Sequence, residues 1–108
     1  MSSVERKRVG GFTVKIERGG RNDTVGIGDR FTAEIEGKVT ALAGAPKTLF
    51  VGSSKGVLVR METETGRRCA RATFGAPVTK LTVRGEVVTA TVGPTKYPVK
   101  TKTLRTAK

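Results

Sequence analysis

The sequence predicts an all-β protein, a single small antiparallel barrel of eight or nine short strands. Glycine and proline recur too often to leave room for helices: between Gly10 and Gly93 the longest stretch free of both, residues 57–65, has nine residues. An ordinary helix has about 11–12 residues. Apolar and polar residues also alternate along several short segments, which is the period-two pattern of a half-buried strand. Both observations favour strands over helices.

The predicted strands follow one another at short intervals. In residues 12–17 and again in residues 31–36, apolar residues alternate with polar ones. Seven further apolar or alternating segments follow, separated by turns that contain Gly or Pro: residues 39–42, 49–51, 57–61, 68–74, 78–84, 87–92 and 99–103. Such spacing indicates an antiparallel meander. Closing the meander into an OB-like or SH3-like barrel would hide its edge strands.

A chain of 108 residues is long enough for one domain, and we assign the barrel to residues 10–99. Residues 1–9 hold a cluster of charges and almost no apolar side chains, and residues 100–108 alternate Lys or Arg with Thr. Neither segment can bury enough surface to offset the entropy lost on ordering. We therefore expect a flexible basic arm at the N-terminus and a flexible basic tail at the C-terminus.

No run of the sequence approaches the roughly 20 apolar residues that a membrane-spanning helix needs, so we expect no membrane insertion. Residues 1–8 are charged and no apolar stretch follows them, unlike a secretory signal. Cys69 is the only cysteine, which excludes an intramolecular disulfide and suits a reducing compartment. The expected location is the cytoplasm, or the nucleoid or nucleus if the partner is DNA.

The chain contains no histidine, and histidine is the residue on which most metal sites and acid–base relays depend. We therefore expect no enzyme activity, no cofactor and no metal site. The cations Arg67, Arg68 and Arg71 lie near Cys69 in the sequence and would favour its thiolate. Without an imidazole base, however, the thiol is expected to be unreactive.

The whole chain has a formal net charge of +12. Most of this positive charge is concentrated in the C-terminal part of the chain. Residues 1–64 contain eleven Lys or Arg and eight Asp or Glu, whereas residues 65–108 contain ten Lys or Arg and a single acid, Glu86. Polarised positive charge is typical of a protein with a polyanionic partner. The first functional hypothesis is therefore nucleic-acid binding, either to RNA, as in a ribonucleoprotein, or to DNA, through a basic β surface.

Strand periodicity places several of these cations on one exposed sheet face, where they could meet phosphates along a nucleic-acid backbone. The four phenylalanines are expected in the core, which leaves Tyr97 as the one plausible ring for stacking on a base. Recognition would then depend on backbone charge and have little sequence specificity. The candidate nucleic-acid-binding residues are Arg67, Arg68, Arg71, Lys80, Arg84, Lys96, Tyr97, Lys100, Lys102 and Arg105.

Residues 37–66 resemble one blade of a WD-repeat-type propeller, through Val39-Thr40-Ala41-Leu42, Leu49-Phe50-Val51 and Val57-Leu58-Val59. Val78-Thr79-Lys80-Leu81, 39 residues after the first of these segments, resembles the start of a second blade. Arg60-Met61-Glu62 stands where the signature Trp-Asp pair would be. Because a propeller needs at least four blades, the resemblance implies a fragment that oligomerisation or a larger complex would complete. This is the second functional hypothesis, a protein-interaction or assembly module.

A second resemblance concerns residues 28–39, which run from Gly28-Asp29-Arg30-Phe31 to Lys38-Val39. This segment is similar to the long first strand of small RNA- and DNA-binding barrels of the OB type. The resemblance implies the barrel fold and the nucleic-acid partner of the first hypothesis.

Overall fold

The structure is a computed structural model that describes residues 3–9, 11–27, 31–45, 47–63, 65 and 67–104. Within these strands the side chains of Ser3, Phe31, Arg68 and Cys69 are outside the description. The described residues form eleven β-strands and no helix, so this part of the chain has no helix long and apolar enough to cross a membrane. The prediction of an all-β, antiparallel protein is confirmed.

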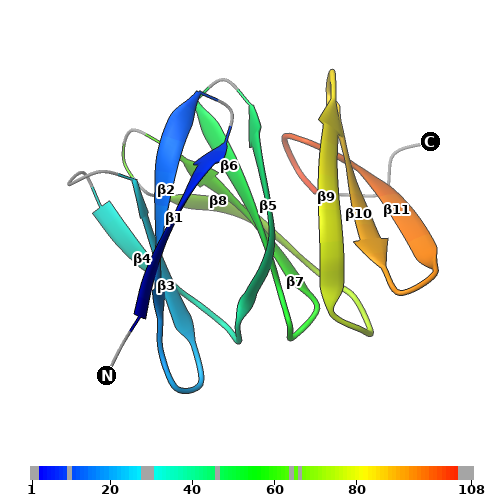
Figure 1. Cartoon of the computed structure of the whole chain (residues 1–108). Coiled ribbons are helices and arrows are strands. Elements are labelled where there is room, and N and C mark those ends of the chain that lie inside the picture. The colour runs from blue at the N-terminus through cyan, green and yellow to red at the C-terminus, as the bar shows by residue number, and fades with distance from the viewer. Residues whose placement is uncertain are drawn as a thin grey trace.

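The strands form three antiparallel sheets that follow one another along the chain (Figure 1). The first sheet contains β1 (Ser3–Val9), β2 (Phe12–Arg18), β3 (Asp23–Ile27) and β4 (Phe31–Ile35). The second sheet contains β5 (Val39–Ala45), β6 (Thr48–Ser53), β7 (Val57–Glu62) and β8 (Arg68–Thr73). The third sheet contains β9 (Val78–Arg84), β10 (Val87–Val92) and β11 (Thr95–Lys100). Each sheet is a meander in which consecutive strands pair.

The described strands do not close into a barrel, so the prediction of an OB-like or SH3-like barrel is wrong. The physical reason is visible in β6, where the successive residues Leu49, Phe50 and Val51 are all fully buried. Successive residues of a strand point to opposite faces, so both faces of the second sheet are covered. The sheets are therefore stacked face to face, with the second sheet between the other two.

The structure has more strands than the eight or nine predicted, because the sequence pattern misses β1 and β3. The N-terminal segment, expected to be a flexible arm, forms β1 and pairs along its length with β2. The last strand is β11, which ends at Lys100, where the sequence suggests a strand over residues 99–103. Beyond it, Leu104 is buried and its N–H donates to the Lys100 carbonyl at 2.7 Å. The folded body thus extends past residues 10–99 at both ends, and residues 105–108 lie outside the description.

Two separate apolar cores lie between the three sheets. Core 1 joins the first sheet to the second and includes Val14, Ile16 and Ile35 from one side and Val51 and Met61 from the other. Core 2 joins the second sheet to the third. It includes Phe50 and Leu58 of the second sheet and Val78, Leu81, Val88, Ala90, Val92 and Val99 of the third sheet.

The first strands of the three sheets, β1, β5 and β9, lie next to one another, and the sheets extend outward from them (Figure 1). Each of these strands has seven residues. β5 begins at Val39 and β9 at Val78, the two positions at which the sequence resembles the start of a propeller blade. Four-stranded sheets arranged around a common axis are the blades of a β-propeller. The fold is an open arc of two four-stranded blades and one three-stranded blade.

Gly52 in β6 allows the third sheet to approach the second closely. A Cβ atom at this position would lie 2.6 Å from Cγ1 and 2.9 Å from Cβ of Val78, the first residue of β9. We predict that Gly52→Ala lowers the free energy of unfolding by about 1–3 kcal/mol, the usual cost of overpacking a core, as measured by urea denaturation. Gly75→Ala is the matched control, because nothing lies within 4 Å of a Cβ placed there; equal losses in the two variants would contradict the prediction.

Candidate functional site

Four of the predicted cations lie together on the outward face of the third sheet. The register of the sheet places Lys80 opposite Thr91, and Thr91 opposite Lys96. It also places Arg84 opposite Val87, and Val87 opposite Lys100. All four cationic residues are exposed, and in the described part of the chain none of them forms an ion pair with a carboxylate. The register therefore places these four side chains on one face of the third sheet.

We call the surface around these cations the terminal face. It consists of the nine outward positions of the third sheet: Lys80, Thr82, Arg84, Val87, Thr89, Thr91, Lys96, Pro98 and Lys100. Cations four residues apart on a strand are about 13 Å apart, and cations two strands apart are about 10 Å apart. The face contains no Asp or Glu. It is a flat surface with positive charge at its four corners and threonines between them.

Tyr97 does not lie on the terminal face. It pairs with Ala90, which is buried in core 2, so its side chain leaves the sheet on the side facing the second sheet. There its ring packs against Phe74, with 5.0 Å between ring centroids and 31° between ring planes. The ring is thus separated from Lys80, Lys96 and their neighbours by the sheet itself.

The remaining predicted site residues lie elsewhere. Arg67 directly precedes β8, and Arg71 within β8 forms an ion pair with Glu36, with 2.9 Å between Nη1 and Oε1. Lys102 lies in the turn that follows β11. The Arg68 side chain and all of Arg105 are outside the described residues. The predicted site is therefore divided between the second and third sheets.

The buried carboxylate of Asp23 is a second charged cluster, which the sequence analysis did not identify. Asp23 has no exposed surface. Its Oδ2 accepts hydrogen bonds from Arg18 Nη1 at 2.6 Å and from the Val39 N–H at 2.9 Å. Its Oδ1 accepts from the Gly19 N–H at 3.1 Å and from Lys38 Nζ at 3.2 Å. Arg18 and Gly19 belong to the same β2–β3 hairpin as Asp23. Lys38 and Val39 reach the carboxylate only because the first sheet packs on the start of β5, and this contact leaves no signal in the local sequence.

The Asp23 carboxylate is stabilised in its ionised form. Burial raises its pKa, but the hydrogen bonds from Val39, Arg18, Gly19 and Lys38 outweigh this effect and hold the pKa below its ordinary value. Arg18 Nη1 also donates to the Val39 carbonyl at 2.9 Å, and its Nε donates to Glu5. All the contacts of the carboxylate are internal. The cluster is suited to joining the first blade to the second.

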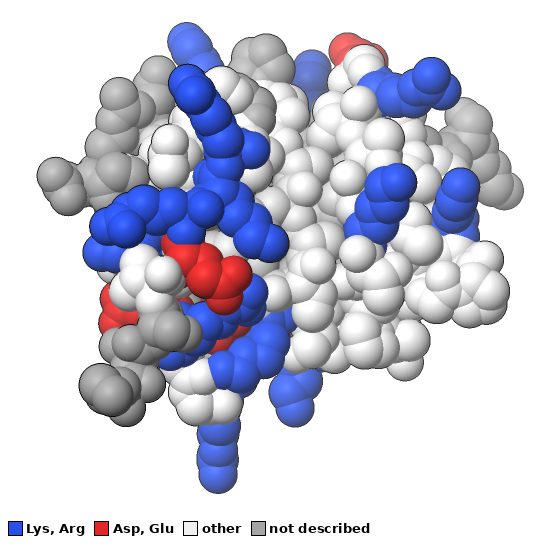
Figure 2. All heavy atoms as spheres, in the orientation of Figure 1, with Lys and Arg blue, Asp and Glu red and all other residues white. Residues whose placement is uncertain are grey.

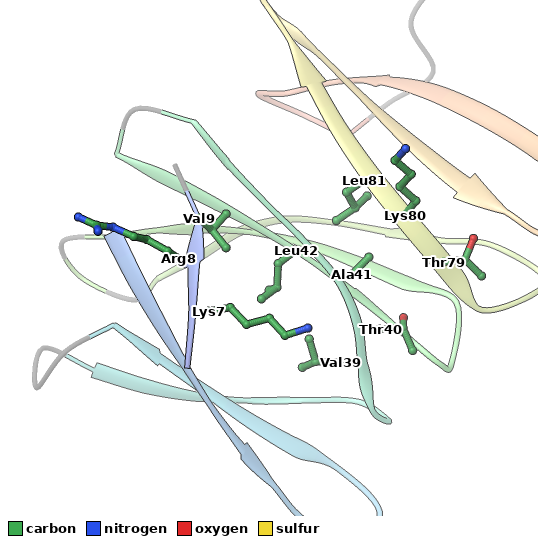
Figure 3. Close-up of a pocket in the computed structure, with 10 residues that line it drawn as sticks. All are labelled: Lys7, Arg8, Val9, Val39, Thr40, Ala41, Leu42, Thr79, Lys80 and Leu81. Carbon is green, nitrogen blue, oxygen red and sulfur yellow. The ribbon is translucent and has the colours of Figure 1, made fainter. Parts of the chain in front are cut away.

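A hollow of about 280 Å³ lies where the first strands of the three blades meet (Figure 3). It is lined by Lys7, Arg8 and Val9 of β1, Val39, Thr40, Ala41 and Leu42 of β5, and Thr79, Lys80 and Leu81 of β9. The Thr40 hydroxyl lies within hydrogen-bonding distance of the Gly52 and Val78 carbonyls, of which the Val78 carbonyl is nearer, and the Thr79 hydroxyl donates to the Thr91 carbonyl. Both hydroxyls are therefore engaged by the backbone. In Figure 3, Arg8 extends away from the other labelled side chains.

Charge is distributed unequally along the arc. Lys and Arg side chains are spread over both ends, whereas most acidic side chains in this view lie over the first sheet (Figure 2). The described residues contain no group of three or more His, Cys, Asp or Glu that could hold a metal ion. Two surface features of the described residues, the terminal face and the hollow, bear on a possible partner.

We found no family model and no curated protein that matches the sequence. Among solved structures, the chain is similar to BamB from Moraxella catarrhalis, with a TM-score of 0.73 and 13% identity over 96% of this chain and 33% of that chain. It is similar to the computationally designed Ika8 protein, with a TM-score of 0.62 and 14% identity over 95% of this chain and 44% of that chain. It also resembles a europium-containing methanol dehydrogenase, with a TM-score of 0.65 and 10% identity over 100% of this chain and 26% of that chain.

These similarities concern the fold alone, because the identities are low. They agree with the arrangement of the three sheets: the chain is a propeller-like fragment of stacked blades. It spans about a third of the BamB chain and about a quarter of the methanol dehydrogenase chain. None of the comparisons supports nucleic-acid binding.

Proposed function

We propose that this chain is a protein-interaction module, an arc of propeller blades that acts as part of a larger assembly and not as an enzyme. The observation that carries the proposal is the stacking of the blades. The second sheet is covered on both faces, whereas the outward face of the third sheet carries exposed side chains. In a propeller, each blade packs against a neighbour on either side. A polypeptide that packs on the exposed face would continue the arc.

The lengths of the similar structures support this proposal. A nearly complete match to this chain occupies 33% of BamB and 26% of the methanol dehydrogenase. Arcs of this shape therefore occur within longer polypeptides. No aromatic ring accompanies the cations on the terminal face. The competing hypothesis of nucleic-acid binding therefore has positive charge as its sole support there.

Photo-cross-linking from the terminal face tests the proposal. A photoreactive amino acid at Thr89, in the middle of the face, should form a discrete adduct in the cells that make the protein. The adduct should be removed by protease and resist nuclease. The matched control is the same amino acid at Lys55, an exposed residue in the turn before β7, where we expect no such adduct. A nuclease-sensitive adduct at Thr89, or the absence of any adduct, would contradict the proposal.

A further inference from the structure

The terminal face is equivalent to a face that is buried elsewhere in the molecule. The corresponding face of the second sheet packs against the third sheet through core 2. There, β5 presents Ala41, Ala43 and Ala45, which pack against or within core 2. β5 and β9 start 39 residues apart. The same offset of 39 residues leads from these alanines to residues of the terminal face. Their equivalents in β9 are Lys80, Thr82 and Arg84.

The second strand of each sheet shows the same replacement. Phe50 and Gly52 of β6 face core 2, and the positions 39 residues later are Thr89 and Thr91 of β10. Small and apolar residues at a blade-to-blade contact are thus replaced by cations and threonines. An apolar blade packed on this face would remove four cations from water without partners, at a cost of several kcal/mol per ion.

From this arrangement we infer that the terminal face binds an acidic polypeptide surface, which supplies carboxylates to Lys80, Arg84, Lys96 and Lys100. This inference rests on the proposed function and names the chemistry of the partner. Cations four residues apart on β9 are separated by about 13 Å, the distance between residues i and i+4 of an extended partner strand. Short threonines between the cations leave room for such a strand or sheet to lie flat. Opposite charges across the contact would both steer the partner and exclude apolar ones.

The partner packs on the face and does not add a strand to the edge of the sheet. The Thr101 N–H donates to the Glu86 carbonyl at 2.9 Å, and hydrogen-bonded pairs alternate along an antiparallel ladder. By this alternation, the backbone nitrogen of Pro98 faces the outer edge of β11, where proline offers no N–H. Lys96 and Lys100 flank it on the same strand. Proline and lysine on an edge strand prevent the pairing of a further strand.

The same face is poorly suited to nucleic acid. Sequence-tolerant binding of single strands depends on rings on which bases can stack, and Tyr97 lies on the opposite face against Phe74. The terminal face is also flat, and it is equivalent to the face through which the second sheet packs on the third. Its geometry therefore favours a polypeptide surface over a nucleic-acid backbone.

The test compares binding to a short peptide of alternating Glu and Thr by the full-length chain and by two charge-reversal variants. Lys80→Glu/Lys96→Glu reverses two cations of the terminal face. Arg6→Glu/Lys15→Glu is the matched control, because these residues are likewise two cations on one outward sheet face, that of the first sheet, where they pair directly across β1 and β2. We expect the terminal-face variant to bind the peptide about tenfold more weakly, from the loss of two charge pairs. The control variant should change the affinity less than twofold.

Two further measurements keep the result decisive. Lys80→Gln/Lys96→Gln removes the charges without reversing them, and it should weaken binding by a smaller factor while leaving the thermal unfolding midpoint unchanged. Oligothymidylate with the same formal charge as the peptide should bind the two charge-reversal variants equally. Equal peptide binding by the two variants would overturn the inference. So would a loss confined to the oligonucleotide, or a change in oligomeric state, measured by light scattering, that only the terminal-face variant shows.

The inference and the proposed function can fail separately. A polypeptide adduct at Thr89, together with equal binding of the acidic peptide by both variants, would retain the interaction module and reject the acidic partner. A nuclease-sensitive adduct would reject both.

Discussion

Replacing Asp23 with Ala should lower the free energy of unfolding by about 3 kcal/mol, because it removes the carboxylate partner of Arg18 and Lys38 and leaves the buried Val39 N–H without its acceptor. The carboxylate has no exposed surface and joins the first blade to the start of β5. Arg18 and Lys38 keep partial contact with water, with side-chain exposures of 25% and 40%. Their exposure places the expected loss toward the lower end of the range for broken buried ion pairs.

Urea denaturation followed by circular dichroism measures this loss. Glu17→Ala is the control, because it removes an exposed carboxylate from β2 of the same sheet and should change the free energy of unfolding by less than about 0.5 kcal/mol. Similar losses in the two variants would show that Asp23 does not join the blades.

The same carboxylate should make the protein sensitive to acid. Because the pKa of Asp23 is lower in the folded chain than its value of about 3.9 in an unfolded one, its stabilising effect is fully present above about pH 4. It is lost as the pH falls from there through the folded-state pKa, because the unfolded chain then binds the proton first. The hydrogen bond from Arg18 lowers the pKa of Glu5 as well. Thermal unfolding between pH 2 and 6 should therefore show a flatter acid limb in Asp23→Asn than in the unaltered protein.

Replacing Phe50 with Ala should have the largest effect on stability, a loss of about 3–5 kcal/mol, the usual cost of truncating a buried phenylalanine. Phe50 has no exposed surface and lies in core 2, between the second and third sheets. The loss should therefore act mainly on the contact between these two blades. Amide hydrogen exchange should show lower protection in β9–β11 than in β1–β4, which pack through core 1.

Val4→Ala is the control for this prediction, because Val4 in β1 is 42% exposed and its truncation should cost little. Uniform loss of exchange protection across all three sheets in Phe50→Ala would mean that the blades unfold as one cooperative unit. That result would contradict the assignment of Phe50 to a separable contact between blades.

Local sequence patterns predict much of this fold. Alternating residues identify β2 and β4, the Gly and Pro turns separate β5 to β10, and the 39-residue spacing marks the starts of β5 and β9. The charged sequence of β1 conceals a strand, because it lacks the apolar alternation by which a strand is recognised. This segment is a strand because it pairs with β2 along its length. Asp23 and Gly26 conceal β3 because a carboxylate and a glycine are not typical of a buried strand. The Asp23 carboxylate is buried because Arg18 and Gly19 of its own hairpin, together with the distant Lys38 and Val39, satisfy it.

The terminal face shows which properties of a surface a local sequence pattern can predict and which it cannot. Lys80, Arg84, Lys96 and Lys100 could be grouped from strand parity, because successive residues leave a sheet on opposite sides. Parity also separates Tyr97 from Lys96, yet it could not show which side faces another sheet. A register shift between Thr91 and Val92 allows Val78 to be buried together with Leu81, three residues away, and such a bulge leaves no clear mark in the sequence.

The sequence by itself therefore determined that the chain is all-β, where most strands lie and where the positive charge collects. Those properties follow from backbone propensity and from the alternation of side chains, which are local. Only the tertiary structure decided that the sheets stack as an open arc of blades and do not close into a barrel. Alternation shows that a face is buried but not what buries it. The burial of both faces of β6 depends on two other sheets, contributed by residues before and after it in the chain.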